Sequence, residues 1–269
     1  MTLTDPEDGL PVAEIGIWSL EKHERLRKYV DAAHGARRRF ISCAYVDLYC
    51  GPGRARIEET GEMADGSPLV AFRSAAKHGD QFTDFYVADR EPAFVEAAKT
   101  RLEKLGARVH AYTGEARNVT KEIIFSLDPK GLHFAFLDPY GLASLPFAII
   151  EELAARKHID LLIHVSSMDL KRNLHNYMKP KSRVLDEFAP NWRQAVDTRL
   201  PKESVRQGIF EHWRELLISR LDIAPNARVE EVLNSKNTDL YWLVFVSRAP
   251  LAHKLWEAIA NVSPQGRLI

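Results

Sequence analysis

Along most of the chain, short apolar runs of strand length alternate with longer segments in which apolar residues recur at helical spacing. Apolar runs of strand length predict strands at 40–48, 83–88, 108–112, 132–137 and 159–165. Between them, apolar residues recur at helical spacing and predict helices over about 20–34, 67–76, 92–105, 118–127 and 146–156. Strands that alternate with helices pair in parallel through right-handed crossovers, so the pattern predicts a doubly wound, mostly parallel α/β sheet.

This rhythm breaks after residue 168. The following residues are charged and mostly helical in spacing, and the runs at 228–234 and 240–246 predict an antiparallel hairpin that closes the sheet, followed by a helix near 250–261. Residues 1–18 predict an irregular lead-in, and 54–66 a polar loop. We therefore expect a lead-in and helix over 1–39, a Rossmann-like core over 40–168, a helical insertion for substrate or partner over 169–227, and C-terminal strands and a helix over 228–269.

The composition is that of an ordinary folded protein, and its charge is balanced. Of 269 residues, 45% are apolar and 28% charged, and Lys+Arg and Asp+Glu both number 37, so any nucleic-acid binding needs a local basic patch. The two cysteines, Cys43 and Cys50, support neither a zinc cluster nor a disulfide framework. The N-terminus lacks the apolar core of a signal peptide and no apolar run is long enough to span a bilayer, so we expect a cytoplasmic protein without membrane contact.

The end of the first predicted strand carries the first chemical clue. Asp47 is followed by Gly51-Pro52-Gly53. Ligands of open α/β sheets collect beyond the carboxyl ends of the strands, and glycines let a ligand approach the backbone closely. The same residues are also compatible with a simple tight turn. The loop matches neither GxGxxG, because Arg56 stands at the last position, nor the GK[ST] of a phosphate-binding loop.

Later strand ends carry further polar residues. Asp89 ends the second strand, where a carboxylate binds ribose hydroxyls in dinucleotide folds, although it is equally suited to capping the next helix. The fourth strand ends in Asp138-Pro139-Tyr140, which offers a hydrogen-bond acceptor, a stiff turn and a ring for stacking on a planar base, or simply a strand-to-helix turn. Polar residues at several successive strand ends favour one shared pocket.

With these motifs, the sequence resembles class I S-adenosylmethionine (SAM)-dependent methyltransferases. "VDLYCGPG" resembles their first motif, Asp89 the acidic residue of the second, and "LDPYG" the fourth, catalytic motif. More narrowly, the chain is similar over roughly residues 15–177 to three-Cys-motif partner (TcmP) proteins, through "W…KHERLRKYV", "YVDLYCGPGRAR", "DGSPLVAF", "YVADREP", "FLDPYG" and "IDLLIHVS".

The resemblance implies a Rossmann-like class I methyltransferase fold and SAM as cofactor. It places the cofactor beside Asp47, Tyr49, Gly51, Gly53, Asp89, Arg90, Glu115 and Ala116. It assigns catalysis to Asp138, Pro139 and Tyr140, with the aspartate orienting the target nitrogen and the tyrosine stacking on the base. The single proline of DPYG departs from the DPPY of many DNA amino-methyltransferases, which leaves the substrate open. Cytosine-C5 chemistry is excluded, because no cysteine follows Cys50.

The segment at 168–183 is the candidate substrate side. Basic residues alternate there with an aromatic ring, as in surfaces that hold a nucleic-acid backbone, and the same charges also suit a solvated helix face. The candidate substrate-binding residues are Lys171, Arg172, Tyr177, Lys179 and Lys181. We expect His164, which ends the fifth strand, to be a packed core residue.

Two functions follow from these motifs. The first is a SAM-dependent methyltransferase acting on a nitrogen of a nucleobase in DNA or RNA. The second is a TcmP-type partner protein, with a SAM-binding or degenerate methyltransferase fold, that assembles with a three-Cys-motif protein on nucleic acid. A nuclease needs Asp47, Asp89 and Asp138 to converge on Mg²⁺, and the glycine spacing disfavours an NAD dehydrogenase.

Overall fold

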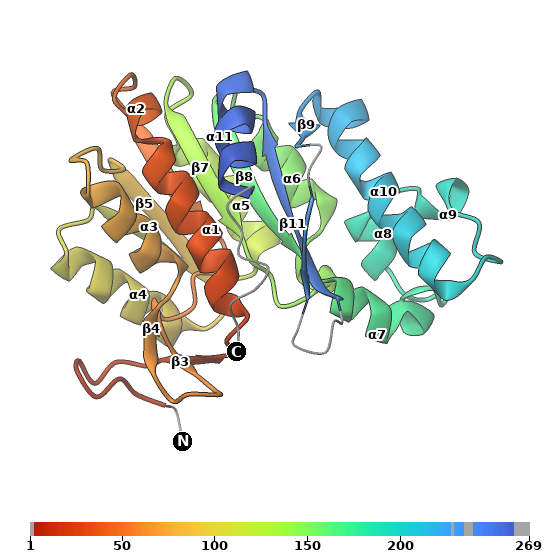
Figure 1. Ribbon diagram of the computed structural model, residues 1–269, viewed down its shortest axis with the longest axis horizontal. Helices are drawn as coiled ribbons and strands as arrows, with labels where there is room; N and C mark the ends of the chain where they lie inside the picture. Colours follow the sequence, from red (N-terminus) through yellow and green to blue (C-terminus); the bar gives the residue numbers. More distant parts are fainter. Residues whose placement is uncertain (1–2, 227–228, 234–238, 261–269) are drawn as a thin grey trace.

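The computed structural model describes residues 3–226, 229–233 and 239–260. At its centre lies a twisted sheet (Figure 1). Its main strands are β2 (Cys43–Asp47), β5 (Asp84–Asp89), β6 (Val109–Thr113), β7 (Leu132–Leu137), β8 (Ile159–Val165), β10 (Glu230–Leu233) and β11 (Asp239–Ser247). A short strand, β9 (Ala224–Pro225), also pairs with β11. The predicted strands are therefore present, each within a few residues of its expected place.

The strand order confirms the predicted fold class. Along the sheet the order is β6-β5-β2-β7-β8-β11-β10. The five strands from β6 to β8 are parallel, and β11 runs antiparallel to both β8 and β10. This is a Rossmann-like, doubly wound sheet whose C-terminal hairpin completes one edge. Residues 228 and 234 of the predicted hairpin strand lie outside the described residues.

Helices cover both faces of the sheet (Figure 1). One face carries α1 (Ser19–Ala32), α3 (Ser67–Ala76), α4 (Pro92–Lys104) and α11 (Pro250–Ala260). The other carries α5 (Ala116–Ser126), α6 (Phe147–Ala154), α7 (Ser167–Tyr177), α8 (Val184–Phe188) and α10 (Lys202–Leu221). Along β2, Cys43 and Tyr45 pack on the first face, while Ala44 and Val46 pack on the second. Both faces are apolar because both are covered, which explains the continuous apolar runs of the parallel strands.

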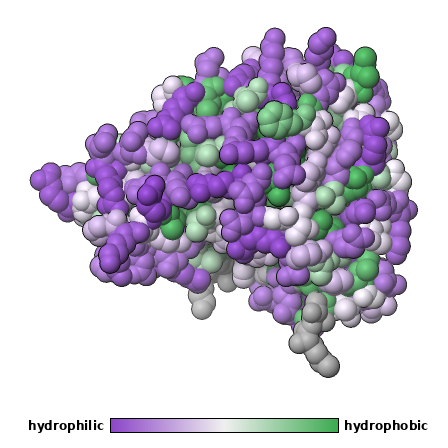
Figure 2. Space-filling view, turned by 180° about the vertical axis from the view of Figure 1, so that it is seen from behind, coloured by the Kyte–Doolittle hydropathy of each residue, from purple (hydrophilic) through white to green (hydrophobic). Residues whose placement is uncertain are grey.

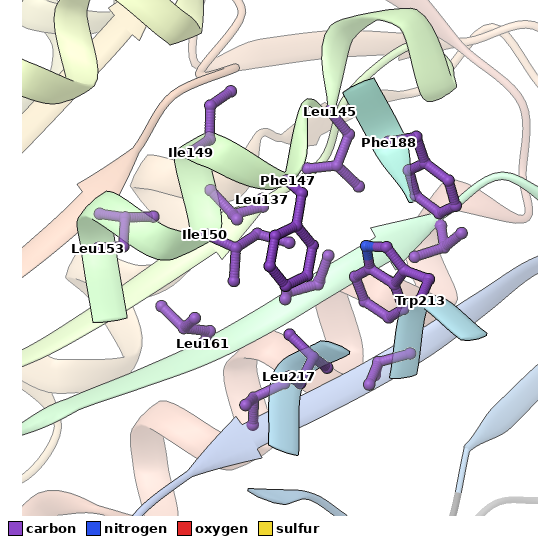
Figure 3. Packing of buried hydrophobic residues seen from close by; sticks show 14 of the residues in the cluster. Leu137, Leu145, Phe147, Ile149, Ile150, Leu153, Leu161, Phe188, Trp213 and Leu217 are labelled. Carbon is purple, nitrogen blue, oxygen red and sulfur yellow. The ribbon is translucent and has the colours of Figure 1, made fainter. Parts of the chain in front are cut away.

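The helices after β8 share the core of the sheet. Figure 3 shows Phe188 of α8 and Trp213 of α10 beside Phe147 of α6 and Leu137 of β7. Phe188 and Trp213 are fully buried and stack with ring centroids 5.5 Å apart. These large rings bury apolar surface that a detached insertion would leave in water. The segment also contains the short helix α9 (Trp192–Ala195), and α2 (His34–Arg37) follows α1.

A second, smaller sheet replaces two stretches that the sequence predicts to be irregular. The strands β1 (Ala13–Ile15), β3 (Arg54–Ile57) and β4 (Met63–Asp65) form a three-stranded sheet in the order β1-β3-β4. Ala55 and Ile57 are buried, whereas Arg54 and Arg56 pair with acidic side chains near the N-terminus. The prediction of an irregular lead-in and a polar loop is wrong here. Buried and charged residues alternate along β3, and the arginines make the segment look like a polar loop in the sequence.

The face seen in Figure 2 is largely hydrophilic, with apolar residues scattered among polar ones. Within the described part of the chain, no helix combines the length and the apolar character needed to cross a bilayer.

Candidate functional site

A pocket of about 300 Å³ lies at the carboxyl ends of four strands. It opens where β5 and β7 flank the first core strand, β2, which is the point where the strand order reverses. Open α/β sheets bind their ligands at such a point. The pocket is lined by Leu48, Tyr49, Asp89, Arg90, Glu115, Ala116, Arg117, Tyr140, Ala143, Ser144, Pro146 and Glu187.

The glycine turn after β2 borders this region without lining the pocket. Gly51 and Gly53 have φ of 54° and 83°, in the left-handed region that favours glycine. A Cβ on Gly53 would lie 3.3 Å from the Ala98 Cα, and a Cβ on Gly66 would lie 3.0 Å from the Gly53 carbonyl. Tight packing against α4 therefore explains Gly53, whereas Gly51 has open space beside it and is explained by its positive φ, with its N–H donating to Asp89.

Asp89 is held by backbone donors at the end of β5. The Gly51 N–H donates to its Oδ2 at 3.1 Å, and the Glu91 N–H donates to its Oδ1 at 3.0 Å. The side chain is 7% exposed and lines the pocket. Asp89 does not cap α4, because Glu91 is the capping residue and its side chain accepts the Ala93 N–H. The Asp89 carboxylate instead holds the turn before that helix and also lines the pocket. Charged acceptors held by N–H donors are pre-oriented for further hydrogen bonds.

Asp47 lies behind the pocket. It is fully buried, and its carboxylate accepts hydrogen bonds from the Tyr45 hydroxyl at 2.9 Å, the Ser67 hydroxyl at 2.6 Å and the Tyr49 N–H at 3.2 Å. Burial raises its pKa from 3.8 to about 7, against the opposing effect of these donors. The structure therefore gives Asp47 contacts that brace the turn, and its atoms do not reach the pocket lining.

The start of α5 forms the far wall of the pocket. Glu115 precedes the helix, its side chain makes no capping bond, and it lines the pocket together with Ala116. The next residue, Arg117, pairs with Glu187 of α8 at 3.2 Å, and both also line the pocket. An ion pair between two helices therefore spans this side of the mouth.

Two tyrosines flank the pocket on the β7 side. Tyr49 donates its hydroxyl to the Ser144 carbonyl, which ties the β2 turn to the loop after β7. Tyr140 is 73% exposed and lines the pocket, so its ring is available to a planar ligand. Arg90 follows Asp89 and is also exposed.

Asp138 lies beside the pocket and is paired with a helix from far away in the sequence. The Lys22 ammonium of α1 lies 2.8 Å from Oδ1 and 2.6 Å from Oδ2, and the His164 Nδ1 lies 3.3 Å from Oδ1. Burial is the largest single influence and raises the pKa of Asp138, but the charge and hydrogen bond of Lys22, together with the neighbouring histidines, lower the pKa overall. Burial also lowers the pKa of His164 to about 4, which leaves the ring neutral at pH 7. The adjacent Pro139 is buried.

The candidate substrate residues lie on and just after α7. Lys171, Arg172 and Lys181 are exposed, and Lys179 bonds the Asn176 side chain at 2.8 Å. Tyr177 is half-buried, and its hydroxyl donates to Asp169. None of the five reaches the pocket lining, so the structure separates them from the cofactor-side candidates.

Some site residues have no signal in a single sequence. Lys22 lies within the "KHERLRKYV" motif, but its partner Asp138 is 116 positions away. Arg117 and Glu187 carry common surface charges, and only the packing of α8 on the core brings them together. His164 is buried as expected, yet it also borders Asp138. In the described ranges, no three side chains of His, Cys, Asp or Glu group as a metal site.

Comparisons with known proteins support the fold. No family model matches the chain. No curated protein matches its sequence. A solved structure from Legionella pneumophila, assigned to the family DUF519, is 13% identical over 88% of this chain and 91% of its own, with a TM-score of 0.51. At this identity the likeness shows a shared fold.

Two other similar structures have lower TM-scores. The methyltransferase domain of a bacterial Hen1 is 14% identical over 84% of this chain and 98% of its own, with a TM-score of 0.44. An rRNA methylase from Streptococcus thermophilus is 13% identical over 84% and 93%, with a TM-score of 0.40. Function therefore has to be argued from the pocket itself.

Proposed function

We propose that this protein binds SAM in the pocket at the strand ends and transfers its methyl group to a nitrogen of a nucleobase. One observation carries the proposal. A single cavity, at the point where the strand order reverses, collects Tyr49, Asp89, Glu115 and Tyr140, which the resemblance assigns to the cofactor and the target.

The lining suits a nucleoside that carries a positive charge. Asp89, held by two N–H donors, offers free acceptor capacity for ribose hydroxyls. The charged lining residues are three carboxylates, Asp89, Glu115 and Glu187, and two guanidinium groups, Arg90 and Arg117. This acidic excess favours a cationic sulfonium ligand over a nucleoside polyphosphate.

The reaction needs positioning more than chemical activation from the protein. SAM, when bound, supplies a methyl group that is already activated by the sulfonium. Tyr140 would stack on the target base at the pocket mouth, and Asp138 would accept a hydrogen bond from its amino group. Lys22 keeps this carboxylate ionised, and therefore an acceptor, at neutral pH.

Nucleic acid is the substrate class that the surface favours. The net charge of the chain is zero, but Lys171, Arg172 and Lys181 form an exposed basic group on and after α7. Such a local group holds phosphates without a global basic field. The helix begins directly after β8, so it leaves the same edge of the sheet as the pocket.

A second candidate is a SAM-binding partner protein that does not transfer the methyl group. The position of Asp138 favours it, because both carboxylate oxygens lie within 2.8 Å of the Lys22 ammonium. In that case the protein would act as the TcmP family name suggests, by assembling with a three-Cys-motif protein on nucleic acid.

Two measurements separate these functions. Calorimetric titration of SAM tests the pocket, and absence of binding would overturn both candidates. Transfer of tritium from labelled SAM to mixed single-stranded RNA and DNA then tests the reaction. Label in a nucleobase supports the methyltransferase, whereas binding without any transfer supports the partner protein.

A further inference from the structure

The loop from Asp138 to Pro146 lies between the pocket and α7. On one side, Tyr140, Ala143 and Ser144 line the pocket. On the other side, the loop meets the first turn of α7 through Asp169. The loop that carries Tyr140 is therefore held from two sides, by the Tyr49 hydroxyl at the Ser144 carbonyl and by Asp169 at the Leu142 N–H.

The Asp169 carboxylate accepts hydrogen bonds from three donor groups, one in the loop and two on α7. Its Oδ2 accepts the Leu142 N–H at 2.8 Å, and its Oδ1 accepts the Asn173 amide at 2.7 Å. The Tyr177 hydroxyl lies 3.1 Å from Oδ1 and 3.0 Å from Oδ2. Burial, with the adjacent Asp169 charge, raises the pKa of Tyr177 to about 12, so the hydroxyl remains a donor at neutral pH. Asn173 and Tyr177 thus hold the Asp169 carboxylate in the orientation in which it accepts the Leu142 N–H of the loop.

Gly141 makes room for this contact. A Cβ at that position would lie 2.8 Å from the Asp169 Oδ2, closer than carbon and oxygen approach without bonding. Its φ of −176° is extended backbone that any residue adopts. The glycine of DPYG is therefore explained by the approach of the carboxylate and not by backbone conformation.

We propose that Asp169 is a positioning residue, which fixes the Gly141–Leu142 turn and so holds Tyr140 at the pocket mouth for the methyl-transfer step. This inference rests on the proposed function and deepens it. It gives Tyr177 a supporting role at Asp169 in place of base stacking. It also ties the loop to the helix that carries the exposed cations Lys171 and Arg172, so bound nucleic acid and Tyr140 would keep a fixed relation.

Hydrogen exchange of the full-length protein tests the contact without any reaction. In Asp169→Ala the Leu142 amide loses a charge-assisted hydrogen bond, and we expect it to exchange about 10-fold faster or more. Asp169→Asn keeps one acceptor oxygen and should restore most of the protection. Asp197→Ala, which removes an exposed carboxylate paired with Arg199, is the matched control and should leave the loop unchanged.

A double substitution tests the geometry. Gly141→Ala should accelerate exchange of the loop by displacing the carboxylate, but in the Asp169→Ala background it should add little, because the clashing group is gone. Equal effects of Gly141→Ala in both backgrounds, or unchanged exchange in Asp169→Ala, would overturn the inference.

Activity separates this inference from the proposed function. We expect Asp169→Ala to lower kcat at least about 10-fold, with SAM affinity within about threefold of wild type, since loss of positioning acts on the transfer step. Asp169→Asn should recover part of kcat. If the wild type does not bind SAM, the proposed function is rejected. If Asp169→Ala exchanges the loop faster but keeps the wild-type kcat, the role of Asp169 in the transfer step is rejected.

Discussion

In the proposed function, Asp89 is the residue on which SAM binding should depend most directly. We predict that Asp89→Asn weakens SAM binding about 10-fold or more, because a charged acceptor of hydroxyl groups is worth about 1.5–3 kcal/mol. The amide oxygen can still accept one of the N–H groups of Gly51 and Glu91, so the fold should persist. Calorimetry and thermal melting measure the two effects. Glu91→Gln is the control, and an equal loss of affinity in both variants would contradict the assignment.

Lys22 neutralises the charge of the Asp138 carboxylate and lowers its pKa. The side chains of the pair are only 13% and 16% exposed, so Lys22→Met leaves a desolvated carboxylate whose neighbouring histidines, His23 and His164, are both neutral at pH 7. We expect the free energy of unfolding at pH 7 to fall by about 3 kcal/mol, as for other broken pairs with little solvent contact. Lys28→Met removes a more exposed pair with Glu24, at 3.6 Å, and should cost at most about 0.5 kcal/mol. Urea denaturation compares the two variants.

Asp47 should make stability depend on pH between its ordinary pKa of 3.8 and its folded pKa of about 7. Its folded pKa is about 7, above the ordinary value of 3.8, so the folded state binds a proton more tightly than the unfolded state. This contribution to stability is complete below pH 4 and is lost as the pH rises towards 7. Asp47→Asn should flatten that part of the curve of unfolding free energy against pH. A curve of unchanged slope would show that Asp47 does not titrate there.

At the scale of elements, Gly53 of the turn after β2 is needed where α4 packs closely against it. Gly53→Ala places a Cβ 3.3 Å from Ala98 at a φ of 83°, so strain and crowding add, and we expect a loss of about 2–3 kcal/mol of unfolding free energy. Gly79→Ala has a similar φ of 69° in open space and should cost about 1–2 kcal/mol. Equal losses in urea denaturation would contradict the packing argument.

The helix α7 is expected to bind phosphates. Removing two contacts by Lys171→Ala with Arg172→Ala should lower affinity for single-stranded RNA and reduce the slope of log affinity against log salt by about 1–2. Fluorescence anisotropy at several salt concentrations measures this slope. Lys130→Ala, in an exposed turn before β7, is the control for nonspecific charge. An unchanged slope in the double variant would place the nucleic acid elsewhere.

At the scale of the whole molecule, the features that could be predicted from the sequence are those with a local pattern, namely the strands, the helices and the polar residues at the strand ends. The parallel strands are apolar on both faces, and their ends bring Asp89 and Tyr140 to one pocket. The small sheet escapes prediction because Arg54 and Arg56 mask its buried residues. The Lys22 pair escapes because it joins segments that only the folded chain brings together. Local periodicity is visible in one sequence, whereas long-range pairing is not.

The packing of α1 against the C-terminal hairpin sets an order of events during synthesis. Tyr29 of α1 lies 4.7 Å from Phe245 of β11 and 6.4 Å from Trp256 of α11, measured between ring centroids. Because a chain leaves the ribosome N-terminus first, α1 can first pack beside Phe134 of β7, whose ring centroid lies 5.1 Å from that of Tyr29. Its contacts with β11 and α11 form only after those later elements have been made. The same helix carries Lys22, so the ammonium partner of Asp138 is available as soon as β7 has been made, before the last elements of the sheet close over α1.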